Sequence, residues 1–324
     1  MIDRIAIVES DGADPYRNLA IEQHLLETVE SGCCFLYLWQ NESTVVIGRN
    51  QNAWAECRTS LLKAEGGRLA RRLSGGGAVF HDLGNLNFTF LMRSEDYDLA
   101  RQMRVIQTAC QSVGIETEVS GRNDLTANGR KFSGNAFYHH EGKSYHHGTL
   151  LIDVDTARMT RYLSPSKAKL SSKGVESVRA RVVNLRELNP DLTVDAMKTA
   201  MRAAFGTVYG LPCAPTPALD ETRIAELTAH YASEEWRFGQ KLPFTFRCES
   251  RFPWGGVELQ LFVDRGVVRD AAVYSDDMDA ETAPKLTAAL RGCPFSCEAL
   301  TARIESQTLP HARDLIQMIT EQEI

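Results

Sequence analysis

Apolar and polar positions along the chain alternate between short runs typical of β-strands and longer stretches with helical spacing. The short runs are rich in β-branched and aromatic side chains and predict strands at residues 3–8, 35–39, 44–48, 78–81 and 86–92. Asp82-Leu83-Gly84-Asn85 has the composition of a turn. We therefore expect a hairpin between the last two of these strands.

Stretches with apolar residues three or four positions apart predict helices. In residues 193–209, Met197, Met201 and Phe205 fall on one face, and Gly210 follows as a typical helix end. Further helices are expected at residues 19–29, 54–65, 95–113, 155–163 and 218–233. The mixture of both element types points to an α+β (mixed α/β) fold.

A second group of strands follows in the middle of the chain, at residues 124–126, 131–138 and 145–154. Asn128-Gly129 favours a tight turn between the first two, so the group predicts a three-stranded meander. The strand pattern begins again near residue 244. It predicts strands at residues 244–246, 257–263 and 267–274, covered by helices at 279–291 and 296–321. We predict two domains, residues 1–243 and 244–324.

Composition narrows the possible functions. The chain has 324 residues and a net charge of −6, which argues against a broad nucleic-acid-binding surface. No apolar run reaches the roughly 18 residues that cross a membrane, and the N-terminus has no signal-peptide core. We expect a cytoplasmic protein with no membrane partner. Its eight cysteines form no C-x-x-C pair, so free thiols are expected.

A glycine-rich stretch, RRLSGGGAVFHDLGN, runs from Arg71 to Asn85. It matches neither the P-loop nor the dinucleotide fingerprint. One interpretation is a loop whose backbone N–H groups face a ligand, with Arg72 and Arg71 neutralising phosphates. The other is a glycine-rich bulge or hairpin that carries surface arginines. The pattern alone leaves both open.

A second stretch, GRNDLTANGRKFSGNAF, places Lys131 just after the predicted turn. A lysine at a strand start can reach into a cleft and bind a carboxylate and a phosphate together. Asp124 could hold Mg²⁺, which prefers one or two carboxylates plus substrate phosphates. An exposed hairpin lysine with no role is the alternative.

Histidines and basic residues are less specific signals. His139, His140, His146 and His147 suggest zinc, but neighbouring residues on a strand face opposite sides, so a shared metal site is disfavoured. His147 is expected to hydrogen-bond near a site or within the fold. The segment 164–185 carries five lysines and arginines that fit either an acidic partner or a solvated face: Lys167, Lys169, Lys173, Arg179 and Arg181.

Taken together, these motifs make the sequence similar to bacterial lipoate–protein ligases of the A family. The resemblance covers nearly the whole chain, through motifs in the family's order: TVVIGRNQN, RRLSGGGAVFHDLGN, GRNDL, GRKFSGNAF, HHGTLL, SSKGVESVRARVVNL and RFPWGGVEL. It implies a catalytic domain of the biotin- and lipoate–protein ligase fold, with mixed sheets and flanking helices. It also implies a small α+β accessory domain that moves during the reaction. The turn 127–129 is shorter than the family's.

The resemblance implies a reaction in which Mg²⁺ and ATP activate lipoate to lipoyl-AMP. The lipoyl group would pass to one lysine of a lipoyl domain, in the E2 subunits of 2-oxoacid dehydrogenases or in the glycine cleavage H protein. We expect a monomer. Lys131 would be the catalytic residue, touching both substrates.

The resemblance also carries over specific site residues. ATP contacts would come from Arg72, Gly77, Ala78, Val79, Phe80 and Lys131. Lipoate contacts would come from Lys131, Ser74, Gly75, Gly76 and His81. Supporting residues would be Arg71, Asn85, Asn123, Asp124, Ser133, His147 and Thr149, with Asp124 holding Mg²⁺ or helping the incoming amine.

The residues supply a mechanism for these assignments. A carboxylate must approach a phosphate, and Lys131 can neutralise both. The lipoyl tail needs an apolar slot, for which residues 44–48 and 78–80 are candidates. Three alternatives stay open: an octanoyl or lipoyl transferase that uses a cysteine thioester, a biotin-type ligase, and a non-catalytic protein that binds lipoate or nucleotide. The absence of cysteine between residues 111 and 212 disfavours the first.

Overall fold

The computed structural model describes residues 1–10, 12–121, 124–164, 182–239, 242–322 and 324. Its largest sheet contains eight strands, in the spatial order β11-β1-β2-β6-β10-β9-β8-β7. These strands are β1 (Arg4–Glu9), β2 (Cys33–Trp39), β6 (Asn85–Arg93), β7 (Glu118–Ser120), β8 (Asp124–Ala127), β9 (Arg130–His140), β10 (Lys143–Leu151) and β11 (Cys213–Ala214). From β2 to the β7 edge of this order, each strand runs antiparallel to the next one. By contrast, β1 is parallel to both of its neighbours, β11 and β2.

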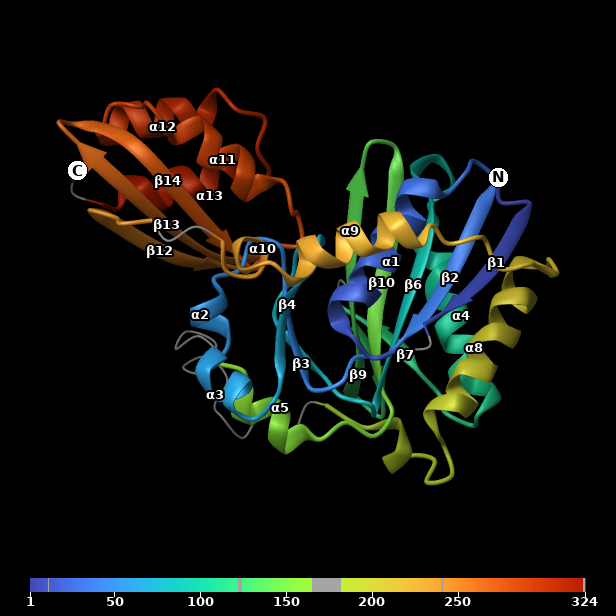
Figure 1. Cartoon of the computed structure of the whole chain (residues 1–324). Helices are drawn as coiled ribbons and strands as arrows, with labels where there is room; N and C mark the ends of the chain where they lie inside the picture. The colour runs from blue at the N-terminus through green and yellow to red at the C-terminus, as the bar shows by residue number, and fades with distance from the viewer. Residues whose placement is uncertain (11, 122–123, 165–181, 240–241, 323) are drawn as a thin grey trace.

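Helices cover both faces of this sheet (Figure 1). One face carries α1 (Pro15–Thr28) and α9 (Glu221–Ala232), and the other carries α4 (Leu99–Ser112) and α8 (Val194–Tyr209). All seven residues of β2 are buried, and alternate ones enter the two cores. A strand buried on both faces reads as a continuous apolar run, which is the pattern of this segment in the sequence.

A smaller sheet has the order β4-β3-β5 and consists of β3 (Thr44–Ile47), β4 (Arg68–Arg71) and β5 (Val79–His81). The predicted hairpin between residues 78–81 and 86–92 is therefore wrong, because β5 pairs with β3 whereas β6 belongs to the large sheet. The chain changes sheets at Gly84, whose oxygen accepts from the N–H groups of Ile152 and Asp153. A Cβ there would lie 2.0 Å from the Asp153 oxygen, so only glycine fits.

Short helices surround the smaller sheet: α2 (Ala53–Glu56), α3 (Thr59–Ala64), α5 (Thr156–Tyr162) and α10 (Glu234–Phe238). The helix predicted over residues 54–65 is interrupted, because Cys57 is extended and bridges to Leu163. The N–H of Arg58 donates to the Tyr162 oxygen at the same place. Single 3-10 turns lie at Ser94–Asp96 and Leu185–Glu187.

The meander of β8, β9 and β10 is confirmed. The Asn128-Gly129 turn has the two positive φ angles, 50° and 72°, that a tight hairpin needs. The helix predicted near residues 193–209 is confirmed as α8, and Gly210 ends it with a left-handed φ of 66°. The basic segment of residues 165–181 lies outside the described residues.

The C-terminal part is a three-stranded antiparallel sheet with helices on it. It contains β12 (Phe246–Phe252), β13 (Gly255–Asp264), β14 (Val267–Ser275), α11 (Thr282–Leu290), α12 (Cys297–Glu305) and α13 (Ala312–Thr320). The single helix predicted at 296–321 is two helices, and His311 before the second has a left-handed φ of 60°. The first strand covers residues 246–252 rather than 244–246.

This C-terminal part has its own apolar core, separate from the cores around the large sheet. In Figure 1 it lies beside α2 and α10, on the side of the molecule away from β1. The overall α+β architecture is confirmed. The boundary at residues 243/244 stays a prediction. Among the described residues, no helix is both long enough and apolar enough to cross a membrane.

Candidate active site

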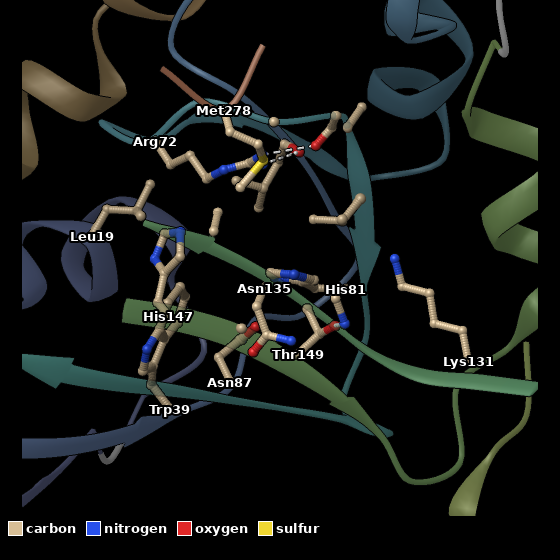
Figure 2. A pocket seen from close by; sticks show the side chains of 18 residues that line it. Leu19, Trp39, Arg72, His81, Asn87, Lys131, Asn135, His147, Thr149 and Met278 are labelled. Atoms are coloured by element: carbon tan, nitrogen blue, oxygen red, sulfur yellow. Dashed lines mark hydrogen bonds between the residues drawn. The ribbon is translucent and has the colours of Figure 1, made fainter. Parts of the chain in front are cut away.

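A cavity of about 170 Å³ opens where the smaller sheet meets strands β6, β9 and β10 of the large sheet. In the view of Figure 2, Leu19, Trp39 and His147 lie on one side of it and Lys131 lies on the opposite side. Val46, Ala78 and Val79 also line it, which agrees with the expected apolar slot. The cavity therefore has an apolar portion and a cationic opening.

Arg72 lines this cavity but is buried, with only 6% of it exposed. Its Nη2 donates to the oxygens of Gly75 and Gly77, at 2.7 and 2.8 Å, and its Nε donates to Ser74 Oγ at 3.0 Å. Burial lowers the pKa of its guanidinium to about 10. In this conformation Arg72 shapes the glycine loop, and its contact with a phosphate stays a prediction.

Arg71 turns the opposite way and does not line the cavity. Its guanidinium donates to backbone oxygens of residues 48, 49, 51, 236 and 237. Burial lowers its pKa to about 10 as well. In this structure the donors of Arg71 hold main-chain oxygens, and its contact with a phosphate stays a prediction.

The three glycines are approached by the chain's own C-terminal part. A Cβ on Gly75 would lie 2.2 Å from the oxygen of Asp277 and 2.6 Å from that of Met278. The N–H of Gly76 donates to the Asp277 oxygen at 2.9 Å, and its φ of 86° favours glycine. Met278 itself lines the cavity. The loop is thus a docking point for the C-terminal part as well as a wall of the site.

Lys131 lies at the start of β9, directly after the tight turn. Its Nζ is 2.7 Å from Oδ1 of Asp124, and both side chains remain about one-third exposed. A Cβ on Gly134 would lie 3.0 Å from this Nζ, so the glycine leaves room for the lysine chain. Lys131 lines the cavity, and its ion pair with Asp124 is a contact that the sequence analysis did not predict. The roles predicted for both residues stay predictions.

A buried chain of hydrogen bonds runs behind the cavity wall. Ser74 Oγ is 2.8 Å from His147 Nε2, and His147 Nδ1 is 2.8 Å from Glu22 Oε1. These are the distances of a Ser–His–carboxylate triad. Ser74 is fully buried, however, and its oxygen already accepts from Arg72 Nε. The chain is therefore better suited to orienting His147 than to nucleophilic attack.

The remaining predicted residues divide into three groups. Gly76, Gly77, His81 and Thr149 line the cavity, as Ala78 and Val79 do. Phe80, Asn85 and Ser133 are buried beside it without lining it. Asn123 lies outside the described residues.

Several cavity residues escaped the sequence analysis. They are Leu19, Trp39, Asn87, Asn135 and Met278. Glu22 on α1, the hydrogen-bond partner of His147, was missed as well. Each lies in an element predicted for its apolar pattern or in a distant turn, so no local signal marked it. A buried Glu within an apolar helix face was the one available hint, since buried carboxylates need partners.

Thiol chemistry finds no support at this site. Of the described residues that line the cavity, none is a cysteine. Burial raises the pKa of Cys34, Cys57 and Cys110 to about 12, so these thiols stay protonated. All eight cysteines are free, as expected.

Comparison with known proteins agrees with this geometry. Residues 14–206 match the family model of the lipoyl protein ligase A/B catalytic domain, and residues 241–324 match that of the bacterial lipoate protein ligase C-terminus. The chain is 40% identical to lipoate-protein ligase A of Psychrobacter cryohalolentis over 95% of its own length and 94% of that protein. The chain belongs to the lipoate–protein ligase family.

Solved structures extend the match to the fold of this ligase. P. falciparum LipL1, crystallised in complex with lipoate, superimposes with a TM-score of 0.86 at 26% identity, covering 98% of this chain and all of that one. The bipartite ligase of Thermoplasma acidophilum, solved in a study of its lipoylation system with an E2 lipoyl domain, gives 0.65 at 25% identity, covering 76% of this chain and all of that one. A lipoate-protein ligase A bound with ATP shares the fold, with a TM-score of 0.62 at 23% identity over 74% of this chain and 99% of that one.

Proposed function

We propose that this ligase activates lipoate with ATP and then transfers the lipoyl group to one lysine of a lipoyl domain. The observation that carries the proposal is the position of Lys131, a partly exposed cation in the lining of a cavity that also has an apolar portion. A linear acid can place its tail against Leu19 and Trp39 and its carboxylate at this cation. Lipoate has that shape, and the related LipL1 was crystallised with it.

In the first step, a carboxylate oxygen of lipoate attacks the α-phosphorus of ATP. The bond to the bridging oxygen breaks, and pyrophosphate leaves with both electrons of that bond. Two anions must approach each other, so the ammonium of Lys131 lowers the barrier by neutralising the crowded oxygens. Arg72, Gly77, Ala78, Val79 and Phe80 are proposed to contact the nucleotide.

In the second step, the ε-amine of the acceptor lysine attacks the carbonyl carbon of lipoyl-AMP. The carbon–oxygen bond to phosphate breaks, AMP leaves, and the amine loses one proton. The leaving group is already activated, so the protein mainly supplies position. Asp124, whose Oδ1 lies 2.7 Å from Lys131 Nζ, is one proposed acceptor of that proton.

Mg²⁺ is the expected companion of ATP, and it would shield the phosphate charge. The donor chemistry fits, because Mg²⁺ uses one or two carboxylates together with substrate phosphates. Asp124 supplies such a carboxylate beside the cavity. In the described part of the chain, no cluster of three or more His, Cys, Asp or Glu side chains suits a metal ion. Asp124 is therefore proposed either as the Mg²⁺ ligand or as the proton acceptor.

The proposed acceptors are the E2 lipoyl domains of 2-oxoacid dehydrogenases and the glycine cleavage H protein. A related archaeal ligase was studied with its E2 lipoyl domain. A cytoplasmic location and a monomeric state belong to the same proposal. Of the alternatives, cysteine-based acyl transfer is disfavoured because no cysteine is among the described residues lining the cavity.

The test is lipoate-dependent exchange of labelled pyrophosphate into ATP. We expect exchange in the wild type and a loss of at least about 100-fold in Lys131→Ala, the size typical of removing one transition-state charge donor. The control is Arg130→Ala, which removes the neighbouring cation, paired with Glu187 and not lining the cavity. It should keep near-normal exchange. Near-normal exchange in Lys131→Ala would contradict the role of this lysine.

A further inference from the structure

His81 lines the cavity and has a buried ring nitrogen without a partner. The residue is 3% exposed, and among the described residues its Nε2 has no hydrogen-bond partner. Its other nitrogen, Nδ1, is 3.1 Å from Nδ2 of Asn41. Burial, followed by the charges of Arg72 and His147, lowers the pKa of His81 to about 3. The ring is therefore neutral near pH 7, and it carries its one proton on either Nδ1 or Nε2.

The position of that proton is set by a chain of hydrogen bonds whose direction can be assigned. It begins at Asn18, which is fully buried. One terminal atom of its amide is 2.7 Å from the backbone oxygen of Gln40 and 3.3 Å from that of Gly12. Backbone oxygens only accept, so this atom must be the NH₂ group. The other atom is the oxygen, and it receives the hydroxyl groups of Ser10 and Tyr37.

The next two contacts assign the donor and acceptor atoms of Asn41 and His81 in the same way. The NH₂ group of Asn18 donates to Oδ1 of Asn41 at 3.0 Å, which makes the opposite atom of that amide a donor. This donor faces His81 Nδ1. Nδ1 must then accept, and in a neutral ring the proton is on Nε2. His81 therefore carries an N–H donor rather than a lone pair at Nε2.

We propose that Asn41 is a positioning residue for this ligase: it holds His81 as a neutral Nε2–H donor for an acceptor atom of the bound acid. The inference rests on the proposed function, because it concerns how the same cavity holds lipoate. Figure 2 shows His81 between the apolar side of the cavity and Lys131. The acceptor is a carboxyl oxygen or a dithiolane sulfur, and octanoate offers only the first of these.

The variant Asn41→Asp reverses the assignment while changing the size of the side chain little. One carboxylate oxygen still accepts from Asn18 Nδ2, so the fold should survive. The other oxygen faces Nδ1 of His81 and can only accept, which draws the proton onto Nδ1. Nε2 then carries a lone pair instead of a proton. At pH 8.5 the ring remains neutral, since burial disfavours its charged form and the positive charge of Arg72 also opposes protonation.

The first measurement needs no ligand. Two-bond ¹H–¹⁵N spectra of the full chain labelled with ¹⁵N-histidine, recorded at pH 8.5, report which ring nitrogen carries the proton. His81 is assigned by comparison with His81→Gln. We expect the proton on Nε2 in the wild type and on Nδ1 in Asn41→Asp. A wild-type proton on Nδ1 would overturn the proposal.

The second measurement is calorimetric binding of lipoate and of octanoate at pH 8.5. We expect Asn41→Asp to bind lipoate about tenfold more weakly, the usual scale for leaving one buried group unpaired. If the variant binds both lipoate and octanoate more weakly, the acceptor is the carboxyl group. If only lipoate binds more weakly, the acceptor is a dithiolane sulfur. Unchanged affinity for both acids would overturn the proposal.

The control variant is Gln40→Glu, which adds the same charge one residue earlier. The side chain of Gln40 donates to the Leu83 oxygen and does not touch His81. It should leave both the proton position and the affinity unchanged. If the wild type bound neither acid, the proposed function would fail, whereas the spectra would still decide the role of Asn41.

Discussion

Single residues at this site do different work from what their type suggests. Two adjacent arginines read alike in the sequence, yet Arg72 lines the cavity and Arg71 fixes backbone oxygens away from it. Of the three predicted cations that the structure describes, Arg71 and Arg72 are buried, whereas Lys131 keeps a partly exposed charge. Residue type predicted three cations that could bind anions, and burial distinguishes the partly exposed Lys131 from the buried Arg71 and Arg72.

The variant Asp124→Asn tests the ion pair between Asp124 and Lys131. Because both side chains are about one-third exposed, we expect the ion pair to contribute less than about 1 kcal/mol to stability. Lipoate-dependent pyrophosphate exchange should nevertheless fall by about tenfold or more, since Lys131 loses its orienting partner. Glu187→Gln, which removes the partner of Arg130 instead, is the matched control. Equal exchange in the two variants would argue against a role for Asp124.

Arg71→Met tests the structural arginine. Removing this guanidinium leaves several backbone oxygens without donors in a site where only 6% of the residue is exposed. We expect a loss of about 3 kcal/mol in the free energy of unfolding, measured with urea. Arg269→Met serves as comparison, because its ion pair with Asp264 is half exposed and should contribute little. A change below about 1 kcal/mol in Arg71→Met would contradict the assignment.

At the scale of elements, the pattern predicted most strands and helices but only some of the strand pairings. Residues 124–154 were predicted as a meander because Asn128-Gly129 encodes a turn locally. The turn 82–85 has a similar composition, yet it carries the chain from one sheet to the other. The decisive contact, with Asp153, lies about 70 residues away in sequence, so no local signal could reveal it.

Gly75→Ala tests the contact between the glycine loop and the C-terminal part. The added Cβ would collide with the oxygens of Asp277 and Met278, so we expect this contact to open. The amides of Gly76 and Ser275, which bridge the two parts, should exchange hydrogen for deuterium faster. Gly12→Ala is the control, since its Cβ meets nothing within 4 Å. Unchanged exchange at both amides would mean that the contact does not depend on Gly75.

At the scale of the whole molecule, the chain combines a broad sheet covered by helices with a smaller C-terminal sheet unit that reaches the cavity through Met278. The family resemblance predicted the fold class and some of the residues that line the cavity, such as Arg72, His81 and Lys131. It did not predict Trp39, Glu22 or Met278, because these reach the site only through tertiary packing. The same packing also buries His81 and His146, and this burial makes the stability of the fold depend on pH.

Stability should fall as the pH drops below about 6.5. Burial lowers the pKa of His81 and of His146 to about 3, so the unfolded chain binds protons that the folded one does not. Each histidine should remove about 1.5 kcal/mol between pH 6.5 and 5.0. Urea unfolding at both pH values measures this. His146→Gln should show a smaller loss than the wild type, and an equal loss would contradict the assignment.

The most direct test of the central claim is mass analysis of an apo lipoyl domain incubated with this protein, lipoate and Mg-ATP. We predict a mass gain of one lipoyl group, located on a single lysine, that disappears when ATP is omitted. A gain that persists without ATP, or no gain with all components present, would contradict ATP-dependent lipoyl transfer.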